Sequence, residues 1–133
     1  MSKEDIIKKL KEYNFDKESY LVISGAAMVL LGIKDKTSDI DISVTEKYND
    51  YLLNNYNCTF ERINEYKKQA YFIDNIINFS TTYYTDNKVF VDNIPVQAPE
   101  EILDLKKKLN REKDKIDIEK IEKYMRLNKW KIH

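Results

Sequence analysis

The two glycines of this chain, Gly25 and Gly32, lie seven positions apart, and the segment around them constrains the fold more than any other. Residues 20–24 form a short apolar run rich in strand-favouring side chains, which predicts a buried strand. Gly25 ends this run, residues 26–31 predict a short helix, and Gly32 stops that helix. The polar residues 34–38 predict a loop. The segment therefore predicts a strand, a tight turn, a short helix and a loop, in that order.

A second strand pattern follows directly, from Asp39 to Val44, in which acidic or hydroxyl side chains alternate with aliphatic ones. This alternation is typical of a half-buried strand, whose successive side chains point to opposite faces. Asp39 and Asp41 therefore share one face, about 6 to 7 Å apart along the chain. Two such carboxylates can bind a divalent cation, and oxygen ligands suit Mg²⁺. Taken alone, however, an acidic pair at a strand edge is most often a solvent-exposed feature.

Ser24 and Gly25 add a second chemical feature beside the acidic pair. Where a strand gives way to a helix, a glycine lets backbone N–H groups approach an anion at the start of the helix. The Ser24 hydroxyl supplies a further donor. A glycine at this position is commonly just a turn. Its combination with Asp39 and Asp41, in this order and spacing, favours a site that binds a metal ion together with a polyphosphate.

The rest of the chain predicts further helices and strands around this site. Apolar spacing, a Ser2 cap and a first-turn Pro99 predict four more helices: one at the amino terminus, one over 46–55, one from Pro99 and one over about 116–127. Antiparallel strands are predicted at 58–63, 70–73, 76–83, 88–91 and 94–96, with Asp-Asn hairpin turns at 74–75 and 92–93. We therefore expect an α+β fold, with a mixed, mostly antiparallel sheet flanked by helices and the C-terminal helices packed alongside.

Composition narrows the class of protein. With 133 residues, 42% of them apolar, the chain supports one core and hence one domain over 1–133. No apolar run approaches the roughly 20 residues of a membrane span, and the amino terminus is charged, so we expect a cytoplasmic protein without membrane association. Cys58 is the only cysteine, which excludes an internal disulfide. The net charge is zero, but the segment from Glu100 onward is basic, with eleven Lys and Arg residues and eight Asp and Glu residues.

Together these features resemble the minimal nucleotidyltransferases of the DNA polymerase beta superfamily, which include abortive-infection toxins, related toxin-antitoxin enzymes and lincosamide-modifying transferases. The family has a Gly-Gly or Gly-Ser pair opening a helix and then an Asp-x-Asp strand, matched here by Ser24-Gly25 and Asp39-Ile40-Asp41. Lys36 and Thr37 precede the acidic pair much as basic and hydroxyl residues do in the family. Residues 89–124 resemble its closing strand, proline-led helix and Lys-rich Arg-x-Lys-Asp signature. The residues of that signature are Lys106, Arg111, Lys113, Asp114 and Asp117.

The resemblance implies a nucleotidyltransferase fold and the transfer of a nucleoside monophosphate from a nucleoside triphosphate to a hydroxyl acceptor on RNA, a protein or a small molecule. Asp39 and Asp41 would hold Mg²⁺ or Mn²⁺. The nucleotide-binding residues would be Ser24, Gly25, Lys36, Thr37, Lys106, Arg111 and Lys113. By the same resemblance, the chain would have an antitoxin-type protein as a partner.

One departure from the family concerns a third carboxylate, which in the family lies on a later strand, binds metal and serves as a base. The matching position here is Asn78, whose neutral amide cannot accept a proton at neutral pH. Asp74 is the alternative candidate, although the predicted hairpin places it in a turn. Two hypotheses follow: an active transferase, or a catalytically inactive module that keeps the fold and binds a nucleotide or a partner.

Overall fold

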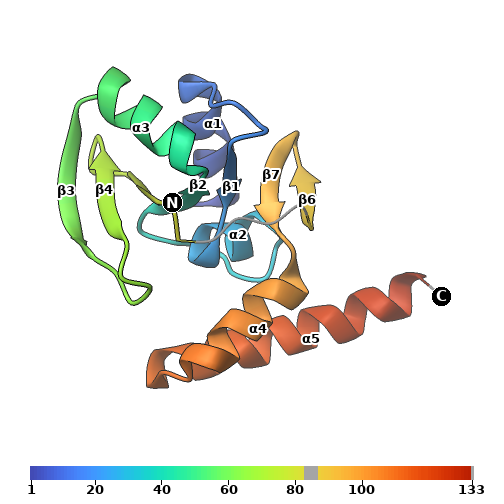
Figure 1. Cartoon of the computed structure of the whole chain (residues 1–133). Coiled ribbons are helices and arrows are strands. Elements are labelled where there is room, and N and C mark those ends of the chain that lie inside the picture. Colours follow the sequence, from blue (N-terminus) through green and yellow to red (C-terminus); the bar gives the residue numbers. More distant parts are fainter. Residues whose placement is uncertain (83–86, 133) are drawn as a thin grey trace.

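A computed structural model describes residues 1–82 and 87–132, with side chains up to Asn128, and within them five α-helices and one seven-stranded sheet (Figure 1). The helices are α1 (Lys3–Tyr13), α2 (Ser24–Leu30), α3 (Glu46–Asn55), α4 (Pro99–Leu109) and α5 (Lys115–Ile132), with a 3₁₀ turn η1 (Glu112–Asp114) before α5. The strands are β1 (Tyr20–Val22), β2 (Ile40–Val44), β3 (Cys58–Ile63), β4 (Gln69–Ile73), β5 (Ile77–Ser80), β6 (Lys88–Val91) and β7 (Ile94–Gln97). The α+β class is confirmed.

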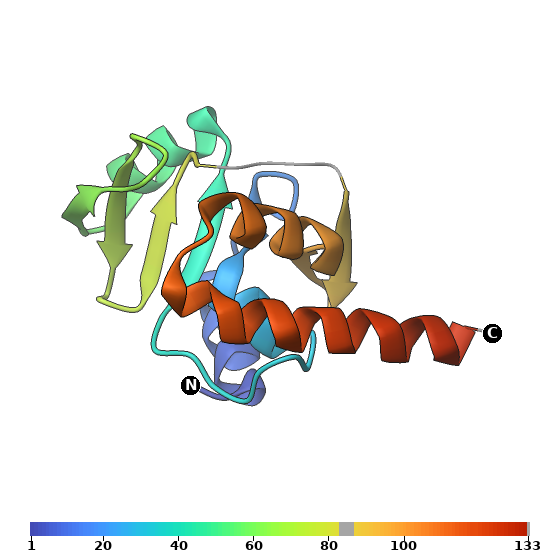
Figure 2. The same cartoon turned by 90° about the horizontal axis from the view of Figure 1, so that it is seen from below.

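The sheet has the strand order β3-β4-β5-β2-β1-β7-β6. Strand β2 runs parallel to β5, and β1 runs parallel to β7, whereas the other four neighbouring pairs are antiparallel. This confirms the expected mixed, mostly antiparallel sheet. Helices α4 and α5 pack against each other beside the sheet, as Figures 1 and 2 show, which confirms the expected pairing of the C-terminal helices. None of the described helices combines the length and apolar content that crossing a bilayer requires.

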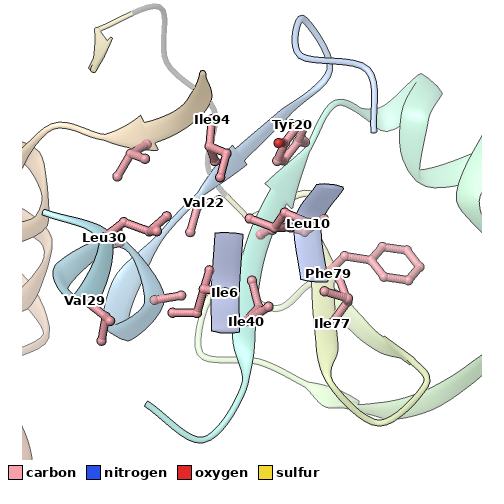
Figure 3. Close-up of a cluster of buried hydrophobic side chains, with 14 of the residues drawn as sticks. Ile6, Leu10, Tyr20, Val22, Val29, Leu30, Ile40, Ile77, Phe79 and Ile94 are labelled. Carbon is pink, nitrogen blue, oxygen red and sulfur yellow. The ribbon is translucent and has the colours of Figure 1, made fainter. Parts of the chain in front are cut away.

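One face of the sheet carries the apolar core. Ile6 and Leu10 of α1 are buried there with side chains of α2, and Figure 3 shows them beside Val22 and Ile40 of the central strands. Because side chains alternate along a strand, Ile40 and its neighbours of the same parity face this core. Asp41 therefore lies on the opposite face of β2, which is the face that α4 approaches.

The predicted hairpin turns are present. The two central residues of both turns have positive φ angles, and these are Asp74 (54°), Asn75 (58°), Asp92 (49°) and Asn93 (66°). Asn and Asp tolerate this left-handed region better than most residues, and it is the conformation that two-residue hairpins need. The strand predicted over 76–83 is shorter in the structure, where β5 spans Ile77–Ser80. Tyr83, the last residue of the predicted strand, lies outside the described residues.

The turn at Gly25 differs from the prediction. Strand β1 ends at Val22 and α2 begins at Ser24, so Gly25 lies within the first helical turn, and Ser24 is the residue with a left-handed φ of 57°. Gly25 has another role, because a Cβ at this position would lie only 3.0 Å from Oγ1 of Thr37, a tight contact that Thr37 would have to relieve by shifting. Its missing side chain thus lets the 34–38 loop pack onto α2. Gly32, with φ +82°, ends the helix as expected.

Candidate functional site

A cleft lies between the polar face of the sheet and helix α4. It encloses about 700 Å³, part of it open to solvent, and its apolar wall includes Ile102, Leu105 and Leu109 of α4. The polar lining consists of Ser24, Asp41, Arg62, Asn64, Glu65, Tyr66, Asn78, Ser80, Thr82, Gln97, Lys106 and Arg111. The strand order brings the ends of β1, β2, β5 and β7 together on one side of the cavity. Helix α4 forms the other side, so residues far apart in the sequence line the same cleft.

Asp41 is the acidic residue on the floor of this cleft. Burial first, and then the negative charge of Asp39, raise its pKa from the ordinary 3.8 to about 7, against the opposite effect of Arg62. Within the described residues no hydrogen bond or ion pair reaches the Asp41 carboxylate. A cation that binds beside a half-buried carboxylate without a partner stabilises its charged form. Asp41 is thus poised to bind a cation.

Asp39 lies immediately before β2, at the rim. Its Oδ1 accepts a hydrogen bond of 3.3 Å from the Ser38 hydroxyl, and its side chain lies outside the cleft lining. It is still close enough for its charge to raise the pKa of Asp41. The predicted acidic pair is therefore adjacent in space, with one member on the floor and the other at the edge of the cleft.

Asn78 stands opposite Asp41, since the parallel register of β2 and β5 pairs these two residues. The Asn78 Nδ2 donates to the backbone oxygen of Tyr71 at 3.3 Å, which leaves its Oδ1 as the oxygen available to a cation. Asp74, the alternative candidate, lies in the β4–β5 turn away from the cleft and accepts a hydrogen bond from the Tyr13 hydroxyl. The structure describes no group of three or more His, Cys, Asp or Glu side chains that could hold a metal ion.

Gln97 was not singled out by the sequence, yet it lies at the end of β7 beside Ser24. Its Oε1 accepts the backbone N–H of Ser24 at 3.2 Å, and the residue is only 2% exposed. Its Nε2 is buried and has no hydrogen-bond partner among the described residues. Buried polar atoms are normally paired, so a cleft-lining amide with a spare donor is suited to a ligand acceptor. The only sequence signal was a polar residue ending an apolar strand before Pro99.

Lys106 and Arg111 enter the cleft from the C-terminal side, and both already have acidic partners. The Nζ of Lys106, a residue that is 7% exposed, lies 3.4 Å from Asp114 and 3.2 Å from Asp117. Arg111 Nε donates to Asp114 at 2.8 Å, and this pairing lowers the pKa of the Asp114 carboxyl against the effect of its burial. Both cations are therefore held in place by a network of buried or partly buried carboxylates.

The structure brings only some of the predicted nucleotide-binding residues to the cleft. Ser24, Lys106 and Arg111 line it. The residues outside its lining are Gly25, Lys36, Thr37 and Lys113. Lys36 and Lys113 are exposed, and Thr37 packs against Gly25, so Thr37 supports the strand-to-helix connection instead of facing the cavity.

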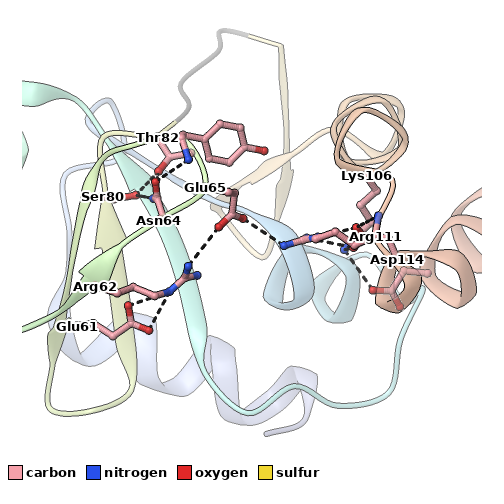
Figure 4. Close-up of polar contacts among 11 residues, drawn as sticks. Glu61, Arg62, Asn64, Glu65, Ser80, Thr82, Lys106, Arg111 and Asp114 are labelled. Carbon is pink, nitrogen blue, oxygen red and sulfur yellow. Dashed lines mark hydrogen bonds and ion pairs between the residues drawn. The ribbon is translucent and has the colours of Figure 1, made fainter.

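Three lining residues that the sequence did not indicate come from the β3–β4 hairpin: Arg62 near the end of β3, and Asn64 and Glu65 in the connection that follows (Figure 4). The Asn64 side chain fixes this hairpin, because its Nδ2 donates to Thr82 at 2.6 Å and its Oδ1 accepts backbone N–H groups of the loop. Arg62 and Glu65 are thereby held over the cleft.

The cleft thus combines a carboxylate poised for a cation, a spare amide donor and three basic side chains, a set of groups that can hold a metal ion and a polyanion together. No family model, no curated protein and no solved structure matches this chain.

Proposed function

We propose that the cleft binds a nucleoside triphosphate with one divalent cation and that the chain transfers a nucleoside monophosphate from it to a hydroxyl acceptor. The observation that carries this proposal is Asp41, a half-buried carboxylate whose pKa is raised to about 7 and which shares its cleft with basic side chains. Strongly perturbed carboxylates in clefts are characteristic of functional sites. The resemblance of the Ser24-Gly25 and Asp39-Ile40-Asp41 segments to nucleotidyltransferases adds the reaction type.

The donor set near Asp41 fits Mg²⁺. The carboxylates of Asp39 and Asp41 and the Oδ1 of Asn78 are hard oxygen donors, and Mg²⁺ commonly takes one or two carboxylates while it keeps waters and phosphate oxygens as its other ligands. When bound, the metal would offset the negative charge on the phosphate undergoing substitution.

The other polar groups of the cleft would bind and orient the nucleotide. Arg111 and Lys106 offset the charge of the triphosphate from the α4 side, and the spare Nε2 of Gln97 donates to an oxygen of the ligand. The apolar wall of α4 limits the access of water to this end of the cleft.

The test is to incubate the purified chain with each of the four labelled nucleoside triphosphates and Mg²⁺ and to measure pyrophosphate release and label transfer to RNA or protein. Asp41→Asn removes the cation-binding carboxylate and should lower turnover by about a hundredfold or more. Asp74→Asn is the matched control, because it makes the same chemical change outside the cleft and should leave turnover unchanged. Absence of pyrophosphate release with every nucleotide would contradict transfer.

A second function, nucleotide binding without transfer, is favoured by one observation. Asn78 occupies the place opposite Asp41, and an amide cannot serve as the base for an incoming hydroxyl. In that case calorimetry should detect Mg²⁺-dependent nucleotide binding that Asp41→Asn weakens, while no pyrophosphate is released. Asn78→Asp would then place a second carboxylate beside Asp41, and a gain of turnover in this variant would identify the chain as a binding module that retains the catalytic framework.

A further inference from the structure

The carboxylate of Glu65 lies between two arginines at the mouth of the cleft. Its Oε1 is 3.3 Å from Nη1 of Arg111, and its Oε2 is 3.3 Å from Nη1 of Arg62 (Figure 4). Arg62 belongs to β3 and Arg111 follows α4, so this single carboxylate links the two walls of the cleft. All three side chains line the cavity, and each is at least 30% exposed.

Arg111 does not depend on Glu65 for its position. Its Nε and Nη2 donate to the two oxygens of Asp114 at 2.8 and 3.1 Å, and the Asp114 side chain is 1% exposed. This two-point pairing fixes the plane of the guanidinium and leaves Nη1 directed toward Glu65. Arg111 therefore presents a fixed donor at the cleft mouth.

Arg62 also has a partner outside the cleft. Its Nε lies 3.0 Å from Oε2 of Glu61, a residue that is not part of the cleft lining, and its Nη1 reaches Glu65 on the inner side. Each arginine thus binds a carboxylate near it in the sequence, Glu61 for Arg62 and Asp114 for Arg111. Each also binds Glu65 through its Nη1.

The contacts of Glu65 are of the kind that a stronger anion displaces. Partly exposed ion pairs contribute little to stability, whereas a phosphate group offers several charged acceptors that match the fork of donors on arginine. An acceptor on a bound ligand would therefore compete successfully with Glu65 for both guanidinium groups.

We propose that Arg62 and Arg111 form a two-arginine site for the distal phosphates of a nucleotide and that Glu65 acts as a built-in competitor for it. The proposal rests on the proposed function in one respect only, which is that the anion belongs to a nucleotide. Ligand phosphates replace the Glu65 carboxylate on both arginines, and the β3–β4 hairpin is released from its link to Arg111. Glu65 thereby weakens the retention of free polyphosphate.

The test is calorimetric titration of the full chain with inorganic pyrophosphate in metal-free buffer. Glu65→Gln keeps the size of the side chain but removes its charge, and it should tighten pyrophosphate binding by about tenfold, because two exposed ion pairs no longer compete. Arg62→Gln should weaken binding by a similar factor. Glu61→Gln is the matched control, since it removes the same charge from the same arginine outside the cleft, and it should change affinity by less than about twofold.

Unchanged or weaker pyrophosphate binding in Glu65→Gln, or equal effects of Glu65→Gln and Glu61→Gln, would overturn the proposal. These outcomes are separable from failure of the proposed function, because the titration contains no metal and requires no turnover. A chain that releases no pyrophosphate from nucleotides but shows the expected order of affinities retains the two-arginine site. If the chain turns over nucleotides but Glu65→Gln does not tighten pyrophosphate binding, the two-arginine site is refuted while the proposed function stands.

Discussion

Replacing Asp41 with Asn should stabilise the protein, and by an amount that depends on pH. The pKa of Asp41 is about 7 in the folded chain and 3.8 without burial. One pKa unit corresponds to about 1.4 kcal/mol, so the difference between the two pKa values amounts to about 4 kcal/mol when Asp41 is fully ionised. This free energy disfavours folding, because the unfolded chain ionises Asp41 more readily than the folded chain does.

The sign follows from the protons bound in each state. Below about pH 4 both states hold the proton, and Asp41 contributes nothing to the pH dependence. Between about pH 4 and pH 7 the unfolded chain loses its proton first, so the free energy of unfolding falls as pH rises. Above pH 7 both states are ionised and the loss is complete. Asp41→Asn lacks this titration, so its advantage over the natural chain should grow from near zero to about 4 kcal/mol across this range.

Urea unfolding followed by circular dichroism at about pH 4, 6 and 8 measures this difference. Asp39→Asn removes the second cause of the raised pKa and should give a smaller gain in the same direction. Asp50→Asn, on the exposed face of α3, is the matched control and should behave like the natural chain. If the natural chain and Asp41→Asn lost stability in parallel between pH 4 and pH 8, the burial of an ionised Asp41 would be refuted.

Two further predictions concern stability. Gly32→Ala should lower the free energy of unfolding by about 1 kcal/mol in urea titrations, because φ is +82° there, and Gly32→Asn should cost less. If Gly32→Asn and Gly32→Ala lowered the free energy of unfolding equally, the positive φ angle of Gly32 would not be the cause of the loss. Asp114→Asn should cost about 3 kcal/mol because it leaves buried Lys106 with one acidic partner fewer. The exposed Asp104–Lys108 pair is the control, and Asp104→Asn should cost about 0.5 kcal/mol or less.

Local features of the fold could be predicted from the sequence because they depend on neighbours in the chain. The Asp-Asn pairs at 74–75 and 92–93 specify hairpins through their own backbone preferences, and Pro99 starts α4 for the same reason. The alternation from Asp39 to Val44 predicted β2, although the strand begins at Ile40, so Asp41 lies in it and Asp39 lies just before it. These elements needed no knowledge of the distant chain.

The lining of the cleft was less predictable because it depends on strand order. Gln97 reaches Ser24 only because β7 lies parallel beside β1, and Arg62 and Glu65 reach Arg111 only through the β3–β4 hairpin. Neither arrangement leaves a periodic signal in the sequence. Lys113, which belongs to the segment that resembles a family signature, is exposed outside the cleft, whereas Arg111, held by Asp114, lines it.

The two walls of the cleft come from segments far apart in the chain, and their order matters while the protein is being made. A ribosome releases the polypeptide from its amino end, so Asp41 and the strands around it emerge well before Ile102 and Arg111. A nascent chain that has paired its strands still lacks the opposing wall and its cations. The cleft is therefore complete only after the residues of α4 and Arg111 have been made, later than most of the sheet.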